Sequence, residues 1–259
     1  MWEILAPAGD QNSAIAAINS GADAIYLGLK QFSARSSADN FDISALKEII
    51  NYAAVFGVKV YVAMNTLVKQ DEVENFLSAV KAAWNCGADA IIMQDIFLGR
   101  AGHEAFPQIT LHLSTQAGVC NEYGARLAKE FGFSRVILAR ETAFEDIERI
   151  AKIIETEVFV QGALCTCFSG QCYLSSFAGG NSGNRGLCKQ PCRKRYTVDR
   201  KGFERASYAL SLADLSVGPR VRELAAAGVT SLHVRGRVRA AACRRPGGNT
   251  YQPRFAGRG

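Results

Sequence analysis

Short apolar runs alternate with longer segments of mixed character along most of the chain. Five runs begin directly after a glycine and cover residues 22–29, 58–65, 88–95, 133–140 and 229–236. A glycine just past a helix end adopts the left-handed conformation without steric cost, so each of these glycines predicts that a helix ends there. The runs themselves are short and apolar throughout, which is typical of strands buried on both faces of a parallel sheet.

The segments between the runs have the period of amphipathic helices. Residues 42–56 (DISALKEIINYAAVF) and 71–85 (DEVENFLSAVKAAWN) carry apolar side chains three and four positions apart. Three further strands fit residues 2–8, 108–115 and 156–163. Eight strands, most of them followed by a helix, predict an α/β protein with a parallel sheet. Closure into a (β/α)8 TIM-type barrel is favoured, and a doubly wound open sheet is the alternative.

Polar residues stand at the predicted carboxyl ends of the strands, where barrel enzymes place their active sites. For any one of them a cap or loop hydrogen bond is the plain alternative, but as a set they predict a polar pocket. They are Gly9, Asp10, Lys30, Asn65, Gln94, Asp95, Ser114, Gln116, Arg140, Glu141, Gln161 and Arg235.

The composition and the first residues of the chain limit which classes of protein are possible. The chain has 259 residues, of which 48% are hydrophobic, so it can bury one large core or two small ones. The first residues, MWEILAPAGD, do not form a basic leader with an apolar core, and no apolar run approaches the roughly 20 residues that span a bilayer. We therefore expect a cytoplasmic protein without a membrane segment, in which thiols stay reduced.

Five of the eight cysteines fall between residues 165 and 192, within GALCTCFSGQC and NRGLCKQPCRKRY. Four thiolates can hold a tetrahedral zinc ion or an iron–sulfur cluster. Structural zinc favours two tight pairs, so the looser spacing fits a cluster better and leaves zinc as the alternative. The spacing C-x6-C-x15-C-x3-C is formed by Cys165, Cys172, Cys188 and Cys192, with Cys167 as an extra thiol.

A cysteine nucleophile would need a nearby base, usually histidine. His103 falls in a helix or loop, His112 lies mid-strand, and His233 is one residue short of the position from which catalytic groups usually project. A cysteine peptidase is therefore poorly supported, because no histidine is well placed to act as its base. Disulfides would need an oxidising compartment.

The net charge of +6 is unevenly distributed, because basic residues greatly outnumber acidic ones after residue 188. A basic segment suits RNA phosphates, and a solvated face is the alternative. We expect residues 1–240 to form the barrel domain with a cysteine-rich loop at 162–205. Residues 241–259 are rich in Gly, Arg and Pro, a composition that predicts a disordered tail. No segment with the pattern of a final barrel helix is visible.

Four stretches resemble the collagenase-like peptidase family, peptidase family U32. The most specific is residues 157–196, EVFVQGALCTCFSGQCYLSSFAGGNSGNRGLCKQPCRKRY, and the others are residues 3–29, 111–121 and 136–142. The resemblance covers nearly all of residues 2–238. It implies a [4Fe–4S] cluster bound by Cys165, Cys172, Cys188 and Cys192. Within the family, the tight SGNRGLCKQPCR form looks most like the branch that acts on RNA.

The resemblance further implies hydroxylation of an RNA base, of the tRNA wobble uridine or 23S rRNA cytidine type, with a prephenate-derived co-substrate. In this interpretation Ser114, Gln116, Arg140 and Glu141 line the substrate pocket. The RNA phosphates are then held by Lys189, Arg193, Lys194 and Arg195.

Two positions depart from the family pattern. Gln161 stands where a histidine is usual, and His233-Val234-Arg235-Gly236-Arg237 replaces Lys-Ile-Glu-Gly-Arg, so a base replaces an acid on the active face. Two alternatives therefore remain open: a peptidase that uses zinc or a cysteine, as the family name implies, and an inactive, truncated family member.

Overall fold

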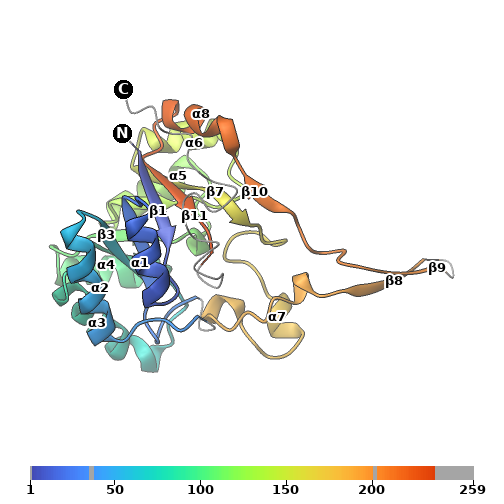
Figure 1. Ribbon diagram of the computed structural model, residues 1–259, viewed down its shortest axis with the longest axis horizontal. Helices are drawn as coiled ribbons and strands as arrows, with labels where there is room; N and C mark the ends of the chain where they lie inside the picture. Colours follow the sequence, from blue (N-terminus) through green and yellow to red (C-terminus); the bar gives the residue numbers. More distant parts are fainter. Residues whose placement is uncertain (1, 35–37, 201–202, 237–259) are drawn as a thin grey trace.

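Eight parallel strands close into a ring in the computed structural model, which describes residues 2–34, 38–200 and 203–236 (Figure 1). The strand β7 pairs with both β6 and β11, and β11 pairs with β1, so the predicted (β/α)8 barrel is confirmed and the open sheet is wrong. The ring consists of β1 (Glu3–Pro7), β2 (Ala24–Gly28), β3 (Lys59–Met64), β4 (Ala90–Met93), β5 (Leu111–Leu113), β6 (Arg135–Ile137), β7 (Glu155–Ala163) and β11 (Ser231–Val234).

Helices cover the outside of the ring. They are α1 (Gln11–Asn19), α2 (Ile43–Val55), α3 (Val73–Asn85), α4 (Ile96–Ala105), α5 (Glu122–Glu130), α6 (Phe144–Ala151) and α8 (Val221–Ala226). The five glycines that predict helix ends all have positive φ, between 67° and 99°. Asp10 and Asp95 cap the N-termini of α1 and α4, accepting backbone N–H bonds, so these two strand-end residues have the plain structural role.

The barrel interior combines an apolar layer with a buried ion network. The apolar layer contains Leu5, Ala24, Tyr26, Tyr61, Ala63, Ala90, Ile92, Ile137 and Phe159. In the ion network, Nη1 of Arg135 lies 2.7 Å from Oε1 of Glu3 and 3.3 Å from Oε2 of Glu157. Burial raises the pKa of Glu3, but the guanidinium of Arg135 outweighs burial and lowers it, so the carboxylate stays ionised.

The connection from β7 to β11 is the main elaboration of the barrel. It contains α7 (Leu174–Phe177), three 3-10 turns at Gly183–Arg185, Pro191–Arg193 and Gly218–Arg220, and the strands β8 (Tyr196–Arg200), β9 (Phe203–Ser207) and β10 (Asp214–Ser216). The strands β8 and β9 form a hairpin that projects away from the barrel (Figure 1). The sequence pattern predicts only a loop at 162–205, and so misses this hairpin.

The predicted tail, residues 241–259, and the place of a final barrel helix lie outside the described residues. Among the helices that the structure describes, none has the length and apolarity needed to cross a membrane.

Candidate functional site

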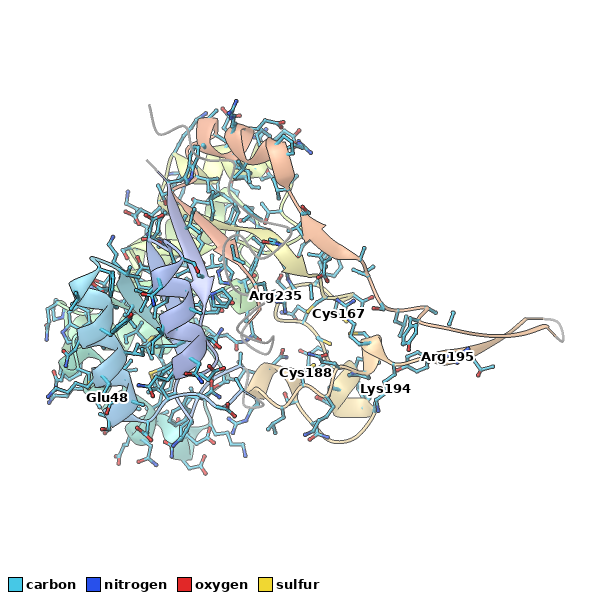
Figure 2. The ribbon with its side chains drawn as sticks, viewed as in Figure 1. Glu48, Cys167, Cys188, Lys194, Arg195 and Arg235 are labelled. Carbon is cyan, nitrogen blue, oxygen red and sulfur yellow. The ribbon has the colours of Figure 1, made fainter. Side chains whose placement is uncertain are left out.

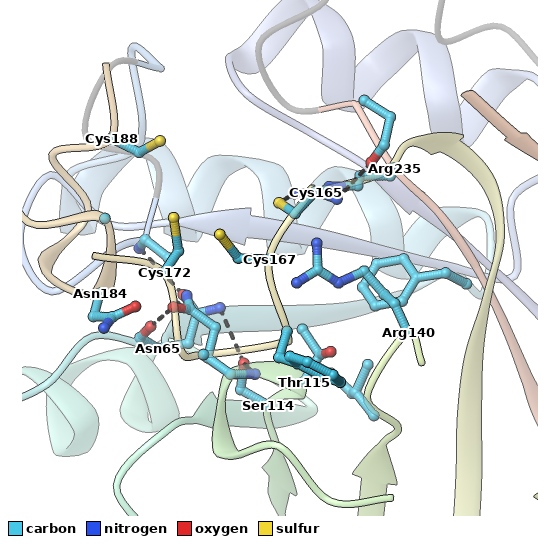
Figure 3. Close-up of a pocket in the computed structure, with 18 of the residues that line it drawn as sticks. Asn65, Ser114, Thr115, Arg140, Cys165, Cys167, Cys172, Asn184, Cys188 and Arg235 are labelled. Atoms are coloured by element: carbon cyan, nitrogen blue, oxygen red, sulfur yellow. Dashed lines mark hydrogen bonds between the residues drawn. The ribbon is translucent and has the colours of Figure 1, made fainter. Parts of the chain in front are cut away.

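A cavity of about 210 Å³ opens at the carboxyl ends of the barrel strands, roofed by the β7–β11 connection. Strand ends form its floor and the cysteine-rich loop forms its wall (Figure 3). The polar and sulfur-bearing side chains that line it are Tyr26, Asn65, Ser114, Thr115, Gln116, Arg140, Cys165, Thr166, Cys167, Cys172, Asn184, Cys188, Gln190, Cys192, His233 and Arg235. Of the strand-end residues that predict a polar pocket, five line this cavity, namely Asn65, Ser114, Gln116, Arg140 and Arg235.

All five clustered cysteines line this one cavity, although 27 positions separate the first from the last. Figure 3 shows the side chains of Cys165, Cys167 and Cys172 turned toward a common space, with Cys188 facing them from the opposite wall. All are half-buried free thiols. Backbone N–H of Gln190 donates to the sulfur of Cys188 at 3.4 Å, which is the kind of contact that stabilises a thiolate.

Two guanidinium groups set the charge around Cys165. Nη2 of Arg235 lies 3.6 Å from its sulfur, and the guanidinium of Arg140 points toward it (Figure 3). Burial raises the pKa of the Cys165 thiol, but the two cations outweigh burial and lower it to about 7. For Cys167, burial and its neighbours Cys172 and Cys165 raise the pKa to about 11. The thiol of Cys165 therefore loses its proton more easily than the thiol of Cys167.

Backbone contacts at two glycines seat the cysteine-rich loop on the barrel. Gly170 has a φ of 75°, and a Cβ there would lie 2.8 Å from the carbonyl carbon of Gln116 and closer still to its oxygen. Gly186 has a φ of 81°, and a Cβ there would overlap the carbonyl oxygen of Ser33. Any side chain at either position would push the loop away from the barrel.

Two arginines tie the loop down further. Arg185 forms a two-pronged ion pair with Glu72, with both N···O distances 2.7 Å, which lowers the pKa of Glu72 to about 2. Arg193 donates to Oγ of Ser211 at 2.6 Å and to backbone carbonyl groups on both sides of the connection. Predicted as an RNA contact, Arg193 is engaged instead in holding the loop together.

The other predicted pocket residues divide into lining and supporting groups. Ser114 and Gln116 line the cavity, and Oγ of Ser114 accepts from Nδ2 of Asn65 at 3.3 Å. Arg140 lines it too, and its Nη1 is buried with no hydrogen-bond partner among the described residues. Glu141 does not line the cavity, because its carboxylate accepts from the backbone N–H and hydroxyl of Ser169 at 2.8 and 3.0 Å.

The predicted RNA contacts Lys189, Lys194 and Arg195 are exposed. Figure 2 shows Lys194 and Arg195 where the β8–β9 hairpin leaves the loop that carries Cys188. Exposed cations on the connection that carries the cysteines can neutralise phosphates of a bound nucleic acid.

Sequence reasoning missed two kinds of lining residue. Asn184 is buried at the wall, and its carbonyl accepts from the backbone N–H of Leu67. His233, placed by the sequence short of the active face, lines the cavity as well. The available signal was its position two residues before Arg235, since alternate residues of a strand share a face.

The arrangement of the sulfurs distinguishes between the two metal groups that the sequence predicts. In the part of the chain that the structure describes, no three Cys, His, Asp or Glu side chains converge closely enough to bind a single metal ion. A tetrahedral zinc site needs such convergence. A cuboidal cluster takes one thiolate per iron, so its ligands surround a volume, as the cysteines of this cavity do. The residues therefore fit a cluster better than zinc.

Comparison with known sequences places the chain in a family. The model of peptidase family U32 matches residues 9–251. The chain belongs to peptidase family U32. The family includes proteins with different names, so membership fixes the fold and leaves several activities open.

Relatives named for RNA hydroxylation and one named as a collagenase align with nearly the whole chain. The tRNA hydroxylation protein P1 of Bacillus subtilis is 32% identical and the 23S rRNA 5-hydroxycytidine C2501 synthase of Escherichia coli is 35% identical, each over 92% of this chain. The collagenase of Porphyromonas gingivalis is 34% identical, also over 92% of the chain. The aligned regions cover 59%, 36% and 61% of these relatives, so the chain spans about three-fifths of their length or less.

A solved structure of the family supports the fold. The U32 peptidase Mk0906 aligns with 90% of this chain, and 92% of that protein is covered, with a TM-score of 0.59 at 11% sequence identity.

Proposed function

We propose that this member of peptidase family U32 hydroxylates a pyrimidine base of RNA, with a [4Fe–4S] cluster in the cavity at the carboxyl end of the barrel. The observation that carries the proposal is the convergence of five cysteines from one loop on a cavity that also holds two guanidinium groups. The names of the relatives from Bacillus subtilis and Escherichia coli supply the reaction class.

In this proposal Cys165, Cys172, Cys188 and Cys192 hold the cluster, which would supply electron-transfer chemistry when bound. Arg235 and Arg140 compensate the negative charge of the thiolates, as their effect on Cys165 indicates. Cys167 is the additional thiol of the cavity and lies beside this set of four.

The rest of the cavity serves the substrate. The amide groups of Asn65 and Gln116 and the hydroxyl of Ser114 can pair with the polar edge of a pyrimidine. The unpartnered Nη1 of Arg140 is a donor suited to a carboxylate, and therefore to the prephenate-derived co-substrate that the resemblance implies. Lys189, Lys194 and Arg195 hold phosphates outside the cavity.

The test is the nucleoside content of RNA from a bacterial host that lacks its own U32 proteins. Expression of this chain should yield a pyrimidine nucleoside heavier by one oxygen atom in tRNA or rRNA, detected by mass spectrometry. Cys172→Ser should abolish the product. Cys86→Ser is the matched control, because Cys86 ends α3 away from the cavity, and it should leave the product level unchanged.

The peptidase alternative rests on the relative named as a collagenase. Among the described residues, no cysteine is hydrogen bonded to a histidine, as a thiol nucleophile would require. Cleavage of gelatin that is lost in Cys165→Ser, without any modified nucleoside, would establish the peptidase and refute the RNA proposal. Retained RNA binding with neither activity would identify an inactive family member.

A further inference from the structure

His233 lies at the floor of the cavity between two aromatic rings. Its ring centroid is 4.4 Å from that of Tyr26 and 4.3 Å from that of Phe159, and only 5% of the residue is exposed. It nevertheless lines the cavity that holds the cysteines. The ring is therefore fixed in orientation and still in reach of a molecule bound there.

A buried carboxylate determines which ring nitrogen faces a ligand. Nδ1 of His233 lies 2.5 Å from Oε1 of Glu157, a residue with no exposed surface. A carboxylate only accepts hydrogen bonds, so Nδ1 carries a proton and a neutral ring has its lone pair on Nε2. Nε2 has no hydrogen-bond partner in the described part of the chain and remains available to a ligand.

A buried ion network lies behind Glu157. Glu157 and Glu3 share the guanidinium of Arg135 inside the barrel, and Nζ of Lys59 lies 3.7 Å from Oε2 of Glu3. A proton accepted by His233 would lie next to the carboxylate of Glu157, which can stabilise the imidazolium while it exists. The ring contacts Tyr26 of β2 and Glu157 of β7, and Arg235, which follows β11, lies over the neighbouring ring of Phe159. The charged and titratable groups behind Glu157 are Arg135, Glu3, Tyr61, Lys59 and Glu155.

The pairing of β11 with β7 is irregular beside the cavity, because β7 has an extra residue, Val160, opposite the step from His233 to Val234. His233 pairs with Phe159 of β7, but the next residue of β11, Val234, pairs with Gln161, so the register shifts by one residue at this point. Such bulges re-aim side chains next to active sites.

We propose that His233 is the proton-transfer residue of this cavity, with Glu157 as its positioning residue. The inference rests on the proposed function and deepens it. In the transfer, one X–H bond of the bound base breaks, its electron pair stays on the base, and an Nε2–H bond forms on His233. The reverse step returns the proton to product or solvent, so no further reactant is consumed.

The variant His233→Asn separates this role from a structural one. The amide N–H of asparagine can replace Nδ1–H as donor to Glu157, but the side chain has no counterpart of Nε2. We expect product formation to fall about 10²- to 10⁴-fold while RNA affinity, iron content and thermal stability stay within twofold or a few degrees of wild type. His112→Asn, on β5 and outside the cavity lining, should retain product formation. An active His233→Asn, within threefold of wild type, would overturn the proposal.

Histidine ¹⁵N NMR of the complete chain tests the geometry without relying on turnover. The chain has three histidines, so each single variant assigns one ring. We expect the neutral His233 ring to carry its proton on Nδ1, and addition of uridine or cytidine monophosphate to shift the Nε2 signal. A neutral ring protonated on Nε2 would refute the inference. If the wild-type chain modifies no RNA, the proposed function fails, and this NMR result alone decides the orientation of His233.

Discussion

The variant Gly170→Ala tests how the cysteine-rich loop is seated, and Gly180→Ala is its matched control. Both glycines belong to the same connection and have similar positive φ angles, 75° and 67°. A Cβ at Gly180 would meet no atom within 4 Å, whereas one at Gly170 would overlap the backbone of Gln116. Both variants therefore introduce the same backbone strain, and only Gly170→Ala introduces a steric overlap with Gln116.

The expected magnitudes follow from these contacts. In each variant, placing alanine in the left-handed conformation costs about 1–2 kcal/mol, and this cost is common to both variants. Gly170→Ala must in addition push the loop off the Gln116 carbonyl group, an overpacking cost of about 1–3 kcal/mol. Relative to the control, the loop should therefore open about 5- to 150-fold more often, since 1.4 kcal/mol corresponds to a factor of ten.

Hydrogen–deuterium exchange of residues 164–172 measures this opening directly. We expect fast exchange in Gly170→Ala, accompanied by lower iron content after anaerobic purification, and near-wild-type behaviour beyond the shared strain in Gly180→Ala. Equal acceleration in both variants would show that the Gln116 contact does not seat the loop, and the reasoning would be refuted.

Two further perturbations test the charges that support the site. Arg135→Met should lower the free energy of unfolding by about 3–5 kcal/mol in urea titrations, because Glu3 and Glu157 lose their shared buried cation; a loss below about 1 kcal/mol would contradict the network. Glu72→Gln should speed amide exchange around Arg185 at pH 7. In wild type, the pKa of Glu72 is lowered to about 2, so the ion pair with Arg185 is complete above about pH 4.5, the ordinary pKa of a glutamate, and is lost as the pH falls toward 2. Exchange around Arg185 that is insensitive to acid over this range would contradict the pairing.

The barrel could be predicted because its strands follow a pattern that is visible in the sequence. Strands such as β3 and β4 are apolar on both faces, and a glycine with positive φ ends the helix before each of them. The β8–β9 hairpin and β10 follow no such rule. They project or pair at the rim, where no core imposes a hydrophobic pattern, so polar sequences such as Asp214–Ser216 form strands through backbone pairing alone.

The thiols of the site could be predicted from the sequence, and the residues around the thiols could be predicted less well. The spacing of the cysteines indicates that they gather, and they line one cavity. Whether a strand residue faces the cavity depends on register, and the extra residue Val160 in β7 cannot be read from the sequence. Glu141 shows the reverse error, because its carboxylate turns to Ser169 and supports the wall from behind.

The central claim is that this cavity holds an iron–sulfur cluster, and quantitative metal and sulfide analysis of anaerobically purified protein tests it most directly. The account predicts about four iron and four sulfide ions per chain, with a broad absorption band near 400 nm, lost together in Cys165→Ser and retained in Cys86→Ser. Stoichiometric zinc without sulfide, or a folded chain that takes up neither metal under reconstitution, would contradict it.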